Sequence, residues 1–146
     1  MNDVKEFTGV PKECTNFMHS PNLEHDTIVK FRENGCLLNS YNVAIITGDL
    51  MVEGVLLILS DGKVVNVVRH SWNKRKDTYY DVTKDYVWTS DEFQNKLRQE
   101  INGNISYKYL SCDEYKAEEI INGSEFIFKY DYSMLIDCIK EKISHH

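Results

Sequence analysis

The chain has no long apolar segment, no excess of positive charge and no paired-cysteine motif. No stretch of its 146 residues approaches the roughly 20 consecutive apolar residues that cross a membrane, and the polar N-terminus is unlike a signal peptide. The net charge of −6 gives no basic face for nucleic acid phosphates. We therefore expect a cytoplasmic protein that acts on a protein or a small molecule, with neither nucleic acid nor a membrane as its partner.

The four cysteines lie far apart in the sequence. They form no C-x-x-C pair and have no metal-ligand spacing with histidine, and His19 and His25 have no convergent ligand set. Four cysteines permit a disulfide framework, but nothing in the sequence indicates an oxidising compartment. We expect reduced thiols, no metal and no cofactor, and we interpret three of the cysteines as small apolar residues: Cys14, Cys112 and Cys138.

Length and hydrophobic patterning predict one α+β domain over residues 1–146. A helix over 36–47 follows Gly35, and an antiparallel meander of three strands follows the helix. The first two strands join at the strong turn signal Asp61-Gly62. We expect the meander to pack against the helix that carries Cys36, with strands at 50–59, 64–72 and 78–83.

The flanking segments are predicted from caps and periodicity. Two segments, 89–92 and 111–114, have the form of capping boxes and each predicts a helix. The remaining predicted elements are a helical turn at 11–13, strands at 105–110 and 126–128, and a terminal helix at 133–143.

The two hairpin turns predict a register that brings three ionisable residues together. With Asp61-Gly62 as a two-residue loop, Glu53 lies opposite His70. With the second hairpin centred on 75–76, His70 lies opposite Asp81. Directly paired residues point to the same face with Cβ atoms about 4.5–5.5 Å apart, so the imidazole would lie between two carboxylates. The row depends on the register, because a slip of one residue in either hairpin destroys it.

The chemistry of this arrangement is that of a cysteine nucleophile. A thiol at a helix start meets backbone N–H groups and the positive end of the helix dipole, which favour the thiolate. A carboxylate beside His70 raises the basicity of the imidazole and orients the ring. Asn39 and Ser40 lie one turn after Cys36, where either can bind substrate or hold the site together.

A family resemblance follows from the order of these residues. Gly-Cys at a helix start, then His-x-Trp, then Asp-x-Thr resembles the transglutaminase-like branch of the papain-like cysteine hydrolases. The resemblance implies Cys36 as nucleophile, His70 as base and Asp81 as its orienting carboxylate. The chain is also similar to small bacterial and phage proteins with four blocks, which here read Cys36 to Asn39, Glu53-Gly54, His70-Ser71-Trp72 and Asp81-Val82-Thr83. Ser71 and Val82 depart from the alanine and proline of those blocks.

Each of these residues also has a structural interpretation. Trp72 is either a substrate platform or, more simply, a core residue, and Glu53 either supports His70 or bonds to backbone or to Asn39. Two alternatives to a hydrolase or acyltransferase therefore stay open. One is a binding module of the same fold without turnover, and the other is a structural domain with a buried polar network. A fast-reacting Cys36 separates the enzyme from both alternatives.

Overall fold

The fold is built on one curled antiparallel sheet. The computed structural model describes residues 5–6, 9–121 and 130–144. Five strands pair in the order β2-β6-β3-β4-β5, and a separate parallel pair joins β1 to β7. The strands are β1 (Lys5–Glu6), β2 (Lys12–Cys14), β3 (Leu50–Ser60), β4 (Lys63–Arg75), β5 (Thr78–Tyr80), β6 (Ile105–Tyr115) and β7 (Tyr130–Asp131).

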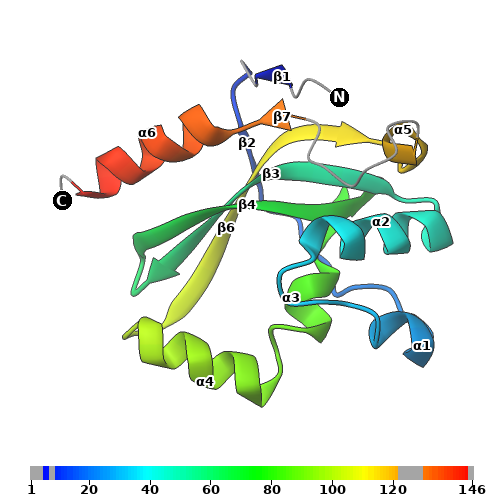
Figure 1. The fold of residues 1–146 in the computed structure, drawn as a ribbon, viewed down its shortest axis with the longest axis horizontal. Coiled ribbons are helices and arrows are strands. Elements are labelled where there is room, and N and C mark those ends of the chain that lie inside the picture. The colour runs from blue at the N-terminus through cyan, green and yellow to red at the C-terminus, as the bar shows by residue number, and fades with distance from the viewer. Residues whose placement is uncertain (1–4, 7–8, 122–129, 145–146) are drawn as a thin grey trace.

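Helices lie on both sides of the sheet, so the predicted α+β class is confirmed. Figure 1 shows α6 above the strands, with α3 and α4 below them. No helix in the described segments has the length and apolar character needed to cross a membrane. The helices are α1 (His25–Ile28), α2 (Cys36–Thr47), α3 (Val82–Tyr86), α4 (Asp91–Glu100), α5 (Glu118–Ile121) and α6 (Ser133–Ser144).

The β3–β4 hairpin has the predicted turn but a shifted register. Asp61 and Gly62 both have positive φ, 49° and 84°, as a tight two-residue hairpin turn requires. A bulge then follows, because Ile58 pairs with Asn66 while Leu59 pairs with Val64, which leaves Val65 as the extra residue. Beyond the bulge every partner moves by one position.

The predicted row of Glu53, His70 and Asp81 is therefore wrong. His70 lies opposite Gly54, and Glu53 lies opposite Ser71. Since alternate side chains of a strand point to opposite faces, Glu53 and His70 lie on different faces of the sheet. We name the side that bears Val52, Leu56, His70 and Trp72 the His70 face, and the side that bears Glu53, Val55, Leu57 and Val67 the Glu53 face.

The third strand is shorter than predicted. Lys76 has φ of 54°, and the turn brings Asn73 opposite Tyr80, after which β5 ends. Asp81 leaves the sheet and becomes the N-cap of α3, where its carboxylate accepts from the backbone N–H groups of Thr83 and Lys84. The change has a local cause, because an aspartate in extended conformation is among the strongest helix N-caps.

Other predictions had mixed outcomes. Helix α4 begins after the Ser90 cap, whose hydroxyl accepts from the Phe93 N–H, and α6 covers the predicted terminal helix.

Residues 111–115 are not a helix, because β6 continues there and pairs with β3 as far as Tyr115. The segment 11–13 is not a helical turn, since β2 pairs with β6. The strand predicted at 126–128 lies outside the described residues.

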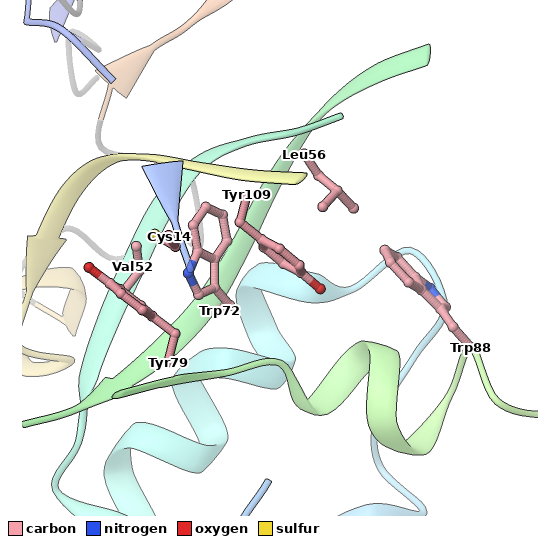
Figure 2. Packing of buried hydrophobic residues seen from close by; sticks show 7 residues of the cluster. All are labelled: Cys14, Val52, Leu56, Trp72, Tyr79, Trp88 and Tyr109. Carbon is pink, nitrogen blue, oxygen red and sulfur yellow. The ribbon is translucent and has the colours of Figure 1, made fainter. Parts of the chain in front are cut away.

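Each face of the sheet has its own apolar cluster. The His70 face packs Val52, Leu56 and Trp72 against Tyr109 of β6 and Trp88, which precedes α4. Figure 2 shows these side chains converging from the sheet and from the segment after α3. The Glu53 face packs against apolar residues of α6 and the preceding Tyr132, and its cluster comprises Val55, Leu57, Val67, Tyr132, Leu135, Ile136 and Ile139.

Candidate cysteine–histidine–aspartate site

The centre of the site is a buried ion pair between β4 and the start of α3. His70 and Asp81 are each 2% exposed, and His70 Nε2 lies 2.8 Å from Asp81 Oδ2. The sequence therefore predicted the correct pair by the wrong geometry. Asp81 reaches His70 from a helix cap one residue beyond the sheet, and no cross-strand pairing is involved.

Asp81 is held in place by four donors. Oδ2 accepts from His70 and, at 2.6 Å, from the Tyr109 hydroxyl, while Oδ1 accepts from the Thr83 and Lys84 N–H groups. Burial alone would raise the pKa of Asp81, but the His70 charge and these donors outweigh burial and lower the pKa below its usual value. The carboxylate is therefore ionised and fixed in orientation.

Cys36 is brought to the same imidazole by the placement of α2 along β4. Ser40 Oγ lies 2.7 Å from Ser71 Oγ, which is next to His70 in β4 but points to the Glu53 face of the sheet. Cys36 lies one helical turn before Ser40 on the same side of α2, and its side chain is a hydrogen-bond partner of His70. Asp81 contacts the ring at Nε2, and the Cys36 side chain is a second partner of the same ring. The ring thus connects the carboxylate to the thiol.

The protonation of His70 follows from these two neighbours. Burial opposes the charged ring, but attraction to Asp81, hydrogen bonding to Asp81 and the interaction with Cys36 raise the pKa of His70 to about 10. At neutral pH the ring is an imidazolium between a carboxylate and a thiol.

Aromatic rings fix the plane of the imidazole. The His70 ring stacks on Trp72, with centroids 5.9 Å apart, and on Trp88, with centroids 5.1 Å apart. Trp72 is fully buried, so the structure supports its interpretation as a core residue over that of a substrate platform. Gly54, opposite His70, admits no side chain, because a Cβ there would lie 2.0 Å from the Leu110 carbonyl oxygen.

The thiol and the imidazole open onto a cleft of about 270 Å³. Its walls are apolar and come from the sheet, from the segment before α4 and from α4 itself. Acidic side chains, Glu33 and Glu100, contribute to its lining. The apolar residues of the walls are Ile58, Val68, Trp88, Phe93, Leu97 and Tyr107.

Asn39 and Ser40 hold the scaffold of the site. The Asn39 amide bonds to both backbone groups of Arg32 and donates to Thr83 Oγ1 at 2.8 Å, which ties α2 to α3. Ser40 bonds to Ser71 and to the Leu37 carbonyl, and both Asn39 and Ser40 are buried. Their side chains therefore connect α2 to neighbouring segments, as the second of the two predicted roles requires.

Glu53, predicted as a support for His70, lies on the opposite face of the sheet. It is fully buried, and the Tyr132 hydroxyl lies 3.5 Å from its Oε2. Tyr115 is another hydrogen-bond partner of Glu53. This buried acid has partners, as expected, and among the described residues they include two tyrosines on the face away from His70.

Sequence reasoning missed the residues that complete the site. Tyr109 lies in the strand predicted at 105–110, with no mark of its contact with Asp81. Trp88 and Phe93 lie at the start of the helix predicted from the capping box at 89–92, and nothing in the local pattern marks their place in the cleft. Thr83 was noted only as part of the Asp-x-Thr block. The one available signal was that block, since Asp followed two residues later by Thr is also typical of a helix N-terminus.

All four cysteines are free thiols, and in the described residues no group of three or more His, Cys, Asp or Glu side chains forms a metal site. Cys138 is exposed, which corrects its interpretation as an apolar core residue. Comparison of the chain with protein-family models, with curated proteins and with solved structures finds no match. The functional argument therefore rests on the geometry of the site.

Proposed function

We propose that this protein is a cysteine-dependent hydrolase or acyltransferase acting on an amide, isopeptide or thioester bond. The observation that supports it most is a single buried imidazole that has a carboxylate and a thiol as its side-chain partners. This is the arrangement of nucleophile, base and orienting acid on which such chemistry depends. A core resembling that of the transglutaminase-like proteins is part of the same proposal.

The reaction would proceed in two halves. The Cys36 thiolate attacks the carbonyl carbon, a C–S bond forms, and the carbonyl electron pair moves onto oxygen, where the N–H groups of the first turn of α2 can stabilise it. The intermediate then expels the amine or thiol, which takes a proton from His70 and leaves a thioester on Cys36. Water or an acceptor amine attacks the thioester, His70 takes the proton, and the acid or new amide departs with Cys36 restored.

The high pKa of His70 makes the second half the slower one. A ring that keeps its proton up to about pH 10 is well prepared to protonate a leaving amine and poorly prepared to accept a proton from water. Acylation of Cys36 removes the thiolate and with it one of the two groups that support the charged ring. The Asp81 contribution persists, so we expect the thioester to accumulate.

The same property favours one alternative, a binding module that engages its ligand without turnover. An imidazolium fixed by Asp81 and flanked by two tryptophans is a rigid cationic surface at the base of an apolar cleft. The alternative shares the geometry of the enzyme and differs from it in the reactivity of Cys36.

Alkylation by iodoacetamide tests the proposal, because the thiolate displaces iodide and the modified cysteine is read by peptide mass spectrometry. Cys138 is exposed and serves as the internal standard. We expect Cys36 to react faster than Cys138 at pH 6.5, where an ordinary thiol with a pKa near 8.5 is about 1% ionised. His70→Ala should remove that advantage. A Cys36 that reacts no faster than Cys138 in the unmodified protein overturns the proposal.

A further inference from the structure

The cleft beside Cys36 has a shape and lining that select a substrate. It extends from the thiol and His70 between the sheet and α4, and its volume of about 270 Å³ lies just below the range of pockets that hold drug-sized ligands. Such a space holds one large side chain or a short acyl chain, and it is too small for several residues of a peptide.

Aromatic rings form the wall on the α4 side. Trp88 and Phe93 stack with centroids 5.5 Å apart and planes within 7°, and Tyr107 contacts Trp88 from the sheet. Phe93 and Tyr107 are half-buried, so their rings present apolar surface to the cleft. A ring or branched chain entering the cleft would bury this surface, and burial of one large apolar group is favourable by about 1.5–3 kcal/mol.

The charges at the cleft are of both signs, because the His70 imidazolium and Arg69 line it together with two carboxylates. Glu33 and Glu100 are both lining residues, and the Lys96 ammonium pairs with Glu33 at 3.1 Å. Arg69 also contributes to the lining, but its guanidinium lies over the Tyr132 ring and 3.6 Å from Asp131. The charged residues of the lining therefore favour neither sign of substrate, and selection rests on the apolar walls.

We infer that the cleft is a specificity pocket for a large, uncharged apolar group carried next to the reacting carbonyl. This inference rests on the proposed function and names its substrate class. The acyl donor is then an amide or thioester with an aromatic or branched aliphatic group adjacent to the bond that is cleaved.

Methanethiosulfonates that differ only in the transferred group test the inference. In each reaction the thiolate attacks the sulfenyl sulfur, a disulfide forms on the cysteine and methanesulfinate leaves. Rates at Cys36 are divided by those at Cys138 in the same molecule, which removes the intrinsic reactivity of each reagent. We expect the ratio to be about tenfold or more higher for the benzyl than for the methyl reagent, because burial of the ring assists the reaction.

Two matched variants locate the effect. Phe93→Ala shortens the cleft wall and should bring the benzyl-to-methyl preference close to one. Phe17→Ala makes the same change at another half-buried ring of the same apolar cluster that does not line the cleft, and it should keep the preference. Both substitutions remove a similar amount of core, so a general loss of stability would affect them alike.

The outcomes separate the two proposals. A fast reaction of Cys36 with the methyl reagent without a benzyl preference, or a preference that Phe93→Ala leaves intact, overturns the specificity pocket while the reactive thiol stands. Slow reaction of Cys36 with every reagent, the methyl one included, overturns the proposed function itself.

Discussion

The two faces of the sheet each place a half-buried thiol beside buried ionisable groups, and they differ in the charge that the thiol meets. On the His70 face Cys36 lies beside an imidazolium and opens onto a cleft. On the Glu53 face, burial together with the Asp113 and Glu53 carboxylates raises the pKa of Cys112 to about 12. The two partly accessible thiols therefore have neighbours of opposite charge: Cys36 has an imidazolium, and Cys112 has two carboxylates that add to the effect of burial.

A one-residue bulge separates these environments. Glu53 and Gly54 are consecutive, and the extra Val65 in β4 determines which of them faces His70. With Glu53 opposite His70, the ring would lie between two carboxylates. As folded, the ring has Asp81 alone on its carboxylate side, and Glu53 bonds to tyrosines. The following substitutions test whether the two faces of the sheet act independently, and they are given in order of decreasing expected effect.

Asp81→Ala should have the largest effect. It removes the acceptor for four donors and leaves a buried imidazole without its counter-charge, so we expect a loss of about 3–5 kcal/mol in the free energy of unfolding. Urea denaturation measures the loss. Asp77→Ala, in the exposed β4–β5 turn, is the matched control and should stay within about 0.5 kcal/mol of the unmodified protein. A loss below about 1 kcal/mol for Asp81→Ala would show that the His70–Asp81 pair does not stabilise the site.

The pH dependence of stability should carry the signature of His70. Its pKa is raised from 6.5 to about 10 on folding, so the stabilisation is complete below pH 6.5 and is lost as pH rises toward 10. The slope is at most about 1.4 kcal/mol per pH unit, the value for one proton. The lowered pKa of Asp81 affects stability in acid. There the stabilisation is lost as pH falls below the pKa that the aspartate has in the unfolded chain. Thermal melting between pH 6 and 10 should show the decline, and the same series on His70→Gln should be flatter.

Glu53→Ala should separate stability from reactivity. The substitution removes a buried carboxylate from its tyrosine partners, at an expected cost of about 1–3 kcal/mol. Because Glu53 faces away from His70, the alkylation rate of Cys36 relative to Cys138 should stay the same. If that ratio falls as far as it does in His70→Ala, the two faces are coupled and their division is incorrect.

Deletion of Val65 should have the smallest effect. Val65 is 45% exposed and is the unpaired residue of the bulge, so its removal lets Ile58, Leu59 and Ser60 pair without interruption. His70 then keeps Gly54 as its partner, and we expect little change in melting temperature or in Cys36 alkylation. A loss of Cys36 reactivity would mean that the deletion slipped the whole strand and exchanged the faces.

The sequence predicted local features well where the cause was local. The Cys36 helix, the Asp61-Gly62 turn and the Ser90 cap depend on neighbouring residues and appear as expected. The register of His70 was not predictable, because a bulge at Val65 leaves no mark in strand alternation that could be read without the partner strand. The second capping box failed for the same reason, since pairing of β6 with β3 outweighs the local preference of 111–114 for a helix.

The sequence predicted which residues come together at the candidate site, but it did not predict the elements that bring them together. Cys36, His70 and Asp81 come together, but Asp81 does so as a helix cap, which also recruits Thr83 and Lys84. The contributions of Tyr109, Trp88 and Phe93 depend on tertiary packing between segments distant in sequence. No spacing rule along the chain could have indicated them.

The most direct test of the account is formation and decay of a thioester on Cys36. The protein is mixed with a phenyl thioester of an aromatic acid, and intact and peptide mass spectrometry follow the acyl group over time. The account predicts rapid acylation of Cys36, accumulation of the thioester and slow release that accelerates as pH rises toward 10, while Cys36→Ser stays unmodified. Absence of acyl transfer to Cys36, or transfer confined to the exposed Cys138, would contradict it.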